Sequence, residues 1–222
     1  MINEEKKQIL FKIPDLLKIV GILGGTLGLL VVILSTIAYI PEHPEFSILT
    51  TYLSDIGDTD GWPQIIFNSG TLIAAPIRYL IIVLLALRLF ELGAGRAFVF
   101  TILLIGFIST FGTILMTATP FSVAPGIHKM GIGLYFLGVV CLQLIIFIRE
   151  WTLKSIPRLL PILSISMVII FLVFAILMIL YEKGMVNRNI PVIWEWMCIL
   201  LSIIWVFAHS IILGDNKGKY LK

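Results

Sequence analysis

Three side chains able to exchange protons come from well-separated stretches of the sequence: Asp55, His128 and Glu195. A histidine with two carboxylates supports acid–base catalysis, and it can also hold a divalent cation weakly. Ser54 directly precedes Asp55 and would supply a hydroxyl nucleophile for attack on a headgroup ester. We therefore take Asp55, His128 and Glu195 as candidate catalytic residues and Ser54 as a candidate substrate-binding residue.

Each of these residues also has a purely structural explanation. Ser54-Asp55 ahead of Gly57 is typical of a turn or a helix cap. Glu195 lies near the N-terminus of its predicted helix, where the helix dipole favours a carboxylate. His128 stands alone after a Pro-Gly turn, as many structural histidines do. The sequence leaves both explanations open.

The chain lacks the short motifs that identify a reaction. It contains no HExxH or HxxxH pair, no GxSxG elbow, no Walker loop and no cysteine–histidine ligand set. We therefore predict no metal site and no cofactor, and the sequence does not decide whether the protein is an enzyme.

Arg78 is the costliest residue of the sequence, because it lies near the middle of a long apolar run. A cation there costs several kcal/mol unless it faces a bundle interior or reaches the headgroups. It either hydrogen-bonds carbonyls that Pro76 frees, or serves as counter-ion to a phosphate or carboxylate in a lipid-binding cavity, or snorkels to the membrane surface. We group Arg78 and Asn68 with Ser54 as candidate substrate-binding residues.

The elements that must position these residues are membrane-spanning helices. The chain has 222 residues, 59% hydrophobic and 13% charged, with a mean hydropathy of +1.07, which is too apolar for a soluble domain. Six runs are long enough to cross a hydrocarbon core of about 30 Å. We predict an all-α, six-helix polytopic bundle forming a single domain over residues 1–222. The expected helices are 17–40, 63–90, 97–119, 128–148, 159–181 and 191–213.

The distribution of basic residues predicts the orientation of this bundle. Twelve of the sixteen lysines and arginines fall on the side that carries both termini, and three fall on the other side. Lysine and arginine accumulate on the cytoplasmic side, so both termini are expected there and the first loop is expected to be extracytoplasmic. The plasma membrane and an endomembrane remain alternatives. The net charge of +3 needs no nucleic-acid partner, and membrane lipids are the expected partners.

The first predicted helix carries closely spaced glycines. Gly21, Gly24, Gly25 and Gly28 give two overlapping GxxxG spacings, which allow close helix approach in lipid. The pattern is typical either of packing inside the bundle or of a homo-oligomer through Gly21, Gly24 and Gly28.

Several short segments spread along the chain can be compared together with known families. They are Ser54-Asp55-Ile56-Gly57, Trp62-Pro63, Phe67, His128 with Gly131 and Gly133, and Glu195-Trp196. Together they resemble the family that unites the damage-regulated autophagy modulators, the FGF-receptor-activating and GPI-anchor remodelling proteins and the yeast Sfk-type proteins. One departure is Pro63-Gln64, where many members of this family have Pro-Glu. A similar Ser-Asp loop also occurs in related prokaryotic six-helix families of unknown function.

The resemblance implies a shared extracytoplasmic site at Asp55, His128 and Glu195 and a link to lipid or GPI-anchor remodelling. It supplies no residue roles. Our first hypothesis is a protein that binds or remodels a lipid or lipid-anchor headgroup in a cavity, with Asp55, Asn68, His128 and Glu195 near one surface and Arg78 deeper. The alternative is a non-enzymatic membrane scaffold or regulator acting through protein partners. A small transporter gated at Arg78 ranks third.

Overall fold

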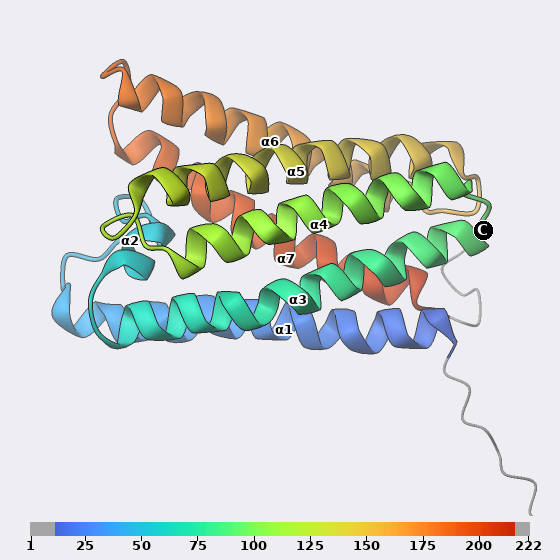
Figure 1. The fold of residues 1–222 in the computed structure, drawn as a ribbon, viewed down its shortest axis with the longest axis horizontal. Coiled ribbons are helices and arrows are strands. Elements are labelled where there is room, and N and C mark those ends of the chain that lie inside the picture. Colours follow the sequence, from blue (N-terminus) through green and yellow to red (C-terminus); the bar gives the residue numbers. More distant parts are fainter. Residues whose placement is uncertain (1–11, 216–222) are drawn as a thin grey trace, which may run out of the picture.

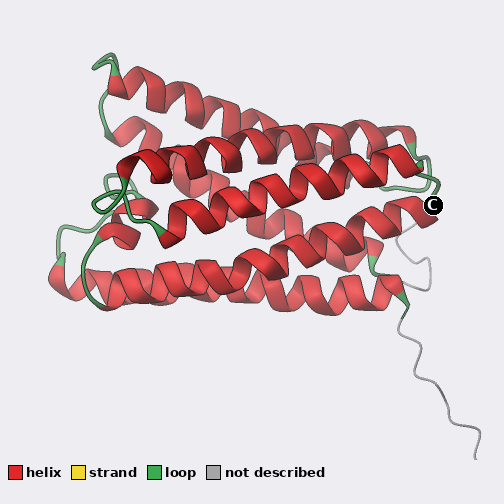
Figure 2. Cartoon of the chain, in the orientation of Figure 1, coloured by secondary structure: helices red, strands yellow, loops and turns green. Residues whose placement is uncertain are grey.

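The computed structural model describes residues 12–215, and every structural statement below refers to this part of the chain. It consists of helices and loops, without strands (Figures 1 and 2). The elements are α1 (Ile13–Tyr39), η1 (Ile40–Glu42), α2 (Leu53–Asp58), α3 (Trp62–Glu91), α4 (Arg96–Ala118), α5 (Pro125–Thr152), α6 (Leu159–Glu182) and α7 (Asn189–Leu213).

The predicted fold class is confirmed. All six long helices are long and apolar enough to cross a membrane, so the protein is a multi-pass integral membrane protein. The helix α5 extends beyond its predicted range at both ends, because Pro125 fits the first turn of a helix and the polar segment around Arg149 and Glu150 stays helical. The short helix α2 has no counterpart among the predicted spans.

The six long helices form a closed ring in chain order. Each packs against its predecessor, from α1 to α3, α4, α5, α6 and α7, and α7 packs back against α1. Two helices also meet across the ring, α3 with α7. The backbones of α5 and α7 do not come within 8 Å of each other, because α6 lies between them. Polar side chains on the inner faces of the six long helices therefore point into the same space inside the ring.

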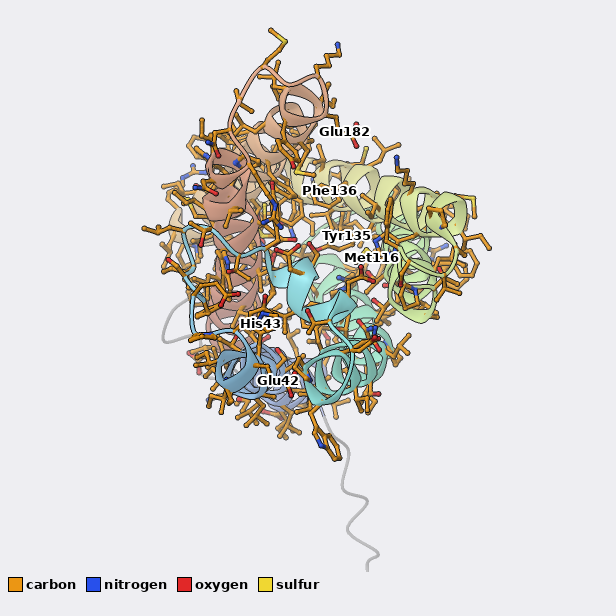
Figure 3. All side chains as sticks on the ribbon, turned by 90° about the vertical axis from the view of Figure 1, so that its left-hand side faces the viewer. Glu42, His43, Met116, Tyr135, Phe136 and Glu182 are labelled. Carbon is orange, nitrogen blue, oxygen red and sulfur yellow. The ribbon has the colours of Figure 1, made fainter. Side chains whose placement is uncertain are left out.

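The two ends of the ring differ. The described chain begins and ends at one end, which we call the terminal end (Figure 1). At the opposite end, the α2 end, α2 lies across the ring against α1, α3 and α7 (Figure 3). The structure contains no membrane, so the predicted sidedness of these ends stays a prediction.

The glycines of α1 pack inside the chain. A Cβ added to Gly21 would overlap the side chain of Ser210 on α7, and one added to Gly24 would lie 2.8 Å from Ile81 on α3. Gly28 leaves more room, since its nearest neighbour, Ile203, would be 3.8 Å away. Gly21 and Gly24 thus allow α1 to approach both neighbours. A homo-oligomer through this face stays a prediction.

Candidate functional site

Glu195 of α7 holds the N-terminus of α2. Its Oε2 accepts the backbone N–H of Leu53 over 2.5 Å, and the amide and hydroxyl of Ser54 face the same carboxylate. The first amides of a helix lack partners within the helix, and a carboxylate satisfies them well. Trp196, the next residue of α7, donates its indole N–H to Thr51 O over 2.9 Å. The start of α7 therefore fixes the chain that leads into α2.

Asp55 caps the same helix from within. Its Oδ2 accepts the N–H of Tyr52 over 3.0 Å and pairs with the Arg188 guanidinium over 2.5 Å. Both side chains of the ion pair are partly exposed, at 33% for Asp55 and 43% for Arg188. Burial alone would lower the pKa of Arg188, but its contact with Asp55 outweighs burial and raises this pKa. Asp55 thus joins α2 to the loop before α7.

Tyr52 completes this contact between α2 and α7. Its hydroxyl donates to Arg188 O over 3.2 Å, and the Arg188 guanidinium lies 4.9 Å from the centre of the Tyr52 ring. Burial and the neighbouring Glu195 carboxylate raise the pKa of Tyr52 to about 12. The phenol therefore stays protonated at neutral pH and remains a donor.

The C-terminus of α2 packs against α3. Asn68 donates its amide N–H to Gly57 O over 2.9 Å. A Cβ on Gly57 would lie 2.6 Å from the Phe67 ring, so only glycine fits this close approach. Ile56, the residue before Gly57, is fully buried. The Ser-Asp-Ile-Gly stretch therefore serves to dock α2.

His128 lies in a different environment. Its Nδ1 is 3.0 Å from Thr119 O at the end of α4, and its ring meets Phe121 edge-on. Because a carbonyl only accepts, Nδ1 is the donor here and caps α4. The helix that carries His128, α5, makes no close backbone contact with α2 or α7.

The structure thus brings Ser54, Asp55 and Glu195 together at one end of α2 and Asn68 at the other, and gives His128 separate contacts. Apart from the Asp55–Arg188 ion pair, these contacts hold backbone groups in place. The catalytic roles of Asp55, His128 and Glu195 stay predictions.

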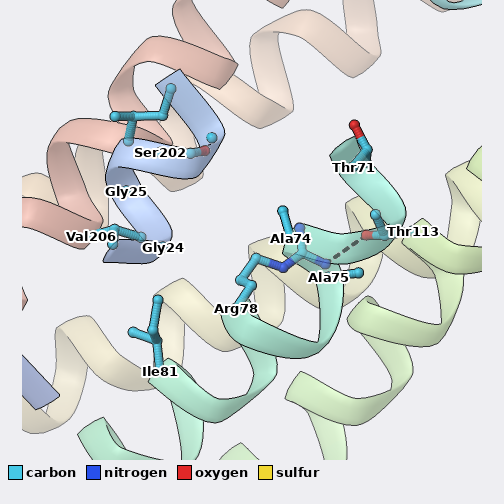
Figure 4. A pocket seen from close by; sticks show the side chains of 12 residues that line it. Gly24, Gly25, Thr71, Ala74, Ala75, Arg78, Ile81, Thr113, Ser202 and Val206 are labelled. Atoms are coloured by element: carbon cyan, nitrogen blue, oxygen red, sulfur yellow. Dashed lines mark hydrogen bonds between the residues drawn. The ribbon is translucent and has the colours of Figure 1, made fainter. Parts of the chain in front are cut away.

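Arg78 is the candidate that faces open space. Two cavities of about 130 and 60 Å³ lie within the ring, and Arg78 lines both. The larger one extends between α1, α3 and α7 (Figure 4). Its walls include Gly24, Gly28, Ala75 and Ile203. Ser202 and Val206 of α7 also line both cavities. This space lies near the middle of the spans.

The guanidinium of Arg78 has polar contacts but no carboxylate partner. It donates to Thr113 Oγ1 over 2.5 Å (Figure 4). It also donates to Ser109 O over 3.5 Å and lies 5.1 Å from the centre of the Tyr135 ring. The four ion pairs formed within residues 12–215 do not include it. Its partners lie on α4 and α5, and none is a carbonyl of α3 that Pro76 frees. Within residues 12–215, this partly buried cation is left without a counter-charge.

The smaller cavity contains a second group without a partner. Gln143 of α5 is 3% exposed, and its Oε1 makes no hydrogen bond in the described structure. Native interiors rarely leave such atoms unsatisfied, so this amide is suited to a polar ligand or to water. Tyr135 and Ser202 lie on the same cavity wall.

A buried polar network closes the interior towards the terminal end. Glu150 of α5 and His209 of α7 are both fully buried, with Glu150 Oε1 lying 3.0 Å from His209 Nε2. Ser164 of α6 donates to Glu150 Oε2 over 3.2 Å and accepts the indole N–H of Trp205 over 2.9 Å. Three consecutive helices therefore share one hydrogen-bonded unit.

This network was not among the sequence candidates. Glu150 lies in a polar helix end beside Arg149, where a glutamate is expected to be solvated. The available signal was helical spacing: Gln143 and Glu150 are seven residues apart on α5, and Ser202 and His209 are seven apart on α7. Such pairs share one helix face.

The comparisons with known proteins agree with the membrane fold. A family described as "Protein of unknown function (DUF998)" matches residues 26–212, which is most of the chain. The chain belongs to this family. Arg78, Gln143, Glu150 and His209 all lie in the part that matches DUF998. No curated protein and no solved structure matches the chain.

DUF998 membership agrees with one of the two alternatives drawn from the resemblance, a six-helix membrane family of unknown function. The match does not extend to the autophagy-modulator, GPI-anchor remodelling or Sfk-type proteins. What those proteins implied about remodelling therefore stays an expectation.

Proposed function

We propose that this membrane protein binds the anionic group of a membrane amphiphile inside its helix ring, with Arg78 as the counter-ion. The observation that carries the proposal is a guanidinium that lines two cavities and has no carboxylate partner among the described residues. A phosphate, sulfate or carboxylate at Arg78 would offset the cost of burying this charge.

The walls of the larger cavity favour an amphiphile over a free inorganic anion. Apart from Arg78 and three hydroxyl-bearing residues, they consist of glycine, alanine and branched aliphatic residues, which suit a hydrocarbon segment. Gly28 leaves part of this space open, because it has no side chain and no neighbouring atom packs closely against it. The polar contacts with Thr113 and Ser109 orient the guanidinium.

The proposal keeps the lipid binding expected from the sequence and centres it on Arg78. It includes no bond cleavage. The alternative, a scaffold acting through protein partners, requires no bound anion. The lipid-binding hypothesis and the scaffold hypothesis therefore differ in whether an anionic amphiphile co-purifies with the protein.

Lipid mass spectrometry on purified protein tests the proposal. We expect an anionic amphiphile class to co-purify with the wild type and to be depleted about tenfold or more in Arg78→Gln, since a charged hydrogen bond contributes about 1.5–3 kcal/mol. Arg96→Gln, at the exposed start of α4, is the matched control and should retain the amphiphile.

A second variant keeps Arg78 and fills the space beside it. Gly28→Leu places a side chain into the larger cavity without a backbone clash, and should also reduce the bound amphiphile. Equal anionic lipid content in the wild type, Arg78→Gln and Gly28→Leu would contradict the proposal, as would a wild type that carries no anionic amphiphile.

A further inference from the structure

We infer that Glu150 and His209 form a buried site for one proton, and that this proton binds together with the anion at Arg78. The first half follows from the geometry of the pair. The second half rests on the proposed function, and the experiment below separates the two.

The hydrogen bonds of His209 determine where its protons lie. Nδ1 is 2.9 Å from Trp205 O, and a carbonyl only accepts, so Nδ1 carries a hydrogen. Nε2 lies 3.0 Å from Glu150 Oε1. Without a further proton, two lone pairs would face each other there. The pair therefore holds one shared proton, as imidazolium with carboxylate or as imidazole with carboxylic acid, and both forms have zero net charge.

Loss of that proton changes the charge and breaks the contact. The pair would become a carboxylate beside a neutral imidazole, with charge −1, at a position where both side chains are 0% exposed. The second oxygen of Glu150 keeps its hydrogen bond from Ser164 in either state. Since α5 and α7 have no close backbone contact, the shared proton is part of what joins them.

Other charged groups near the terminal end are engaged elsewhere. On α3, Arg88 binds Leu213 O and Glu91. On α5, Arg149 donates to Gly93 O, and after α5 Arg158 donates to Trp151 O. On α1 and α4, Lys18 and Arg96 are exposed. From α6 and α7, only Ser164 and Trp205 complete the network. Among residues 12–215, Arg149 and Arg78 are both partly buried without a carboxylate partner, but Arg149 lies at the end of α5 against Gly93 O, whereas Arg78 lines the two cavities.

The smaller cavity reaches from Arg78 towards the proton site. The Arg78 guanidinium lies against the ring of Tyr135, and Glu150 follows Tyr135 fifteen residues later on α5, about 20 Å along the helix axis. Gln143 lines the smaller cavity between these two levels. Trp205 lines the same cavity and belongs to the network.

Charge balance then links the two sites. With an empty cavity, loss of the proton gives the pair a charge of −1 and balances Arg78. With an anion at Arg78, the neutral, protonated pair is favoured. Two unit charges about 20 Å apart at an effective dielectric constant of about 20 change affinity about fourfold. Acid conditions should therefore strengthen anion binding, and anion binding should draw a proton into the protein.

Calorimetry in nanodiscs tests this linkage, with hexyl sulfate as a probe whose charge is constant between about pH 5 and 9. Titrations in two buffers of different ionisation enthalpy report the protons taken up. We expect the wild type to gain a fraction of a proton on binding and to bind about fourfold more tightly at the acid end. Glu150→Gln mimics the neutral pair, so it should bind tightly at every pH without proton uptake. Glu182→Gln, an exposed glutamate at the end of α6, should behave as the wild type.

The calorimetry results distinguish the anion site at Arg78 from its linkage to the proton of the Glu150–His209 pair. Wild-type binding that depends on Arg78 but takes up no proton at any pH would overturn the linkage and leave the proposed function standing. Absence of binding in the wild type would overturn both the anion site and its linkage.

A ligand-independent measurement tests the proton site itself. The chain has three histidines, so replacing His43 and His128 by glutamine leaves His209 as the sole ¹⁵N-histidine signal. We expect Nδ1 to stay protonated and Nε2 to lose its shared proton in one step as the pH rises. A bare Nε2 throughout the range, or a shared proton that never leaves, would contradict an exchangeable site.

Discussion

Glu195 on α7 accepts the backbone N–H of Leu53, the first residue of α2, across 142 positions of the sequence. This hydrogen bond makes α2 a structural part of the ring although it is only six residues long. An isolated helix of that length would not persist in water, so its docking contacts decide whether it forms.

We predict that Glu195→Ala loosens α2. Removing the acceptor leaves the Leu53 N–H without its partner, at a cost of about 1–3 kcal/mol. Hydrogen exchange should accelerate about tenfold or more at the amides of 53–58, and Glu195→Gln, which retains an oxygen acceptor, should show a smaller change. Glu182→Ala serves as control. Unchanged exchange in Glu195→Ala would show that other contacts hold α2.

The Asp55–Arg188 pair should contribute much less. Both side chains are about a third or more exposed, so solvent screening limits their coupling to about 0.2–1 kcal/mol. A double-mutant cycle with Asp55→Asn and Arg188→Gln, followed by thermal unfolding, measures this coupling. It should shrink as salt rises. A coupling of several kcal/mol that is insensitive to salt would contradict this assessment.

Two glycines of α1 form a matched pair for testing helix packing. Gly21→Ala should destabilise the protein by about 1–3 kcal/mol, because the added methyl overlaps Ser210 and forces α1 away from α7. Gly28→Ala should be tolerated, since its methyl enters the larger cavity. Thermal unfolding in detergent compares them, and equal melting temperatures would show that the α1–α7 contact yields easily.

Tyr52 provides a test in alkaline solution. Its pKa is raised from 10.0 to about 12, mainly by burial and then by Glu195. A raised pKa in the folded state means that this stabilisation is complete below pH 10 and is lost as the pH rises through 10 towards 12. The tyrosinate absorbance of the wild type minus that of Tyr52→Phe should show its step near pH 12. A step near pH 10 would indicate a solvated phenol.

The helices could be predicted from the sequence because lipid imposes a simple rule. About 20 apolar residues span the membrane, and backbone groups must be satisfied within each segment. The same rule gave no information on α2, since Leu53–Asp58 is stabilised by partners on α3 and α7. Ser54-Asp55 did carry a capping signal, and Asp55 does cap the helix.

The interior could be predicted only in part. Arg78 stood out because an arginine amid apolar residues is costly wherever it points. Glu150 and His209 did not stand out, because their burial and their contact depend on which faces of α5 and α7 point into the ring. A helix spacing shows which residues share a face, but not which face meets which neighbour. The proton shared by these two residues is a property of the pair, and neither residue alone indicates it.

The chain-order ring also has a consequence for biosynthesis. Every helix from α3 to α7 meets a neighbour that has already entered the membrane, so the bundle can grow by adding one hairpin partner at a time. The contact of α1 with α7 differs, because it joins the first helix made to the last. Gly21 and Ser210 lie at that junction, so the fit between them decides whether the newly synthesised bundle closes.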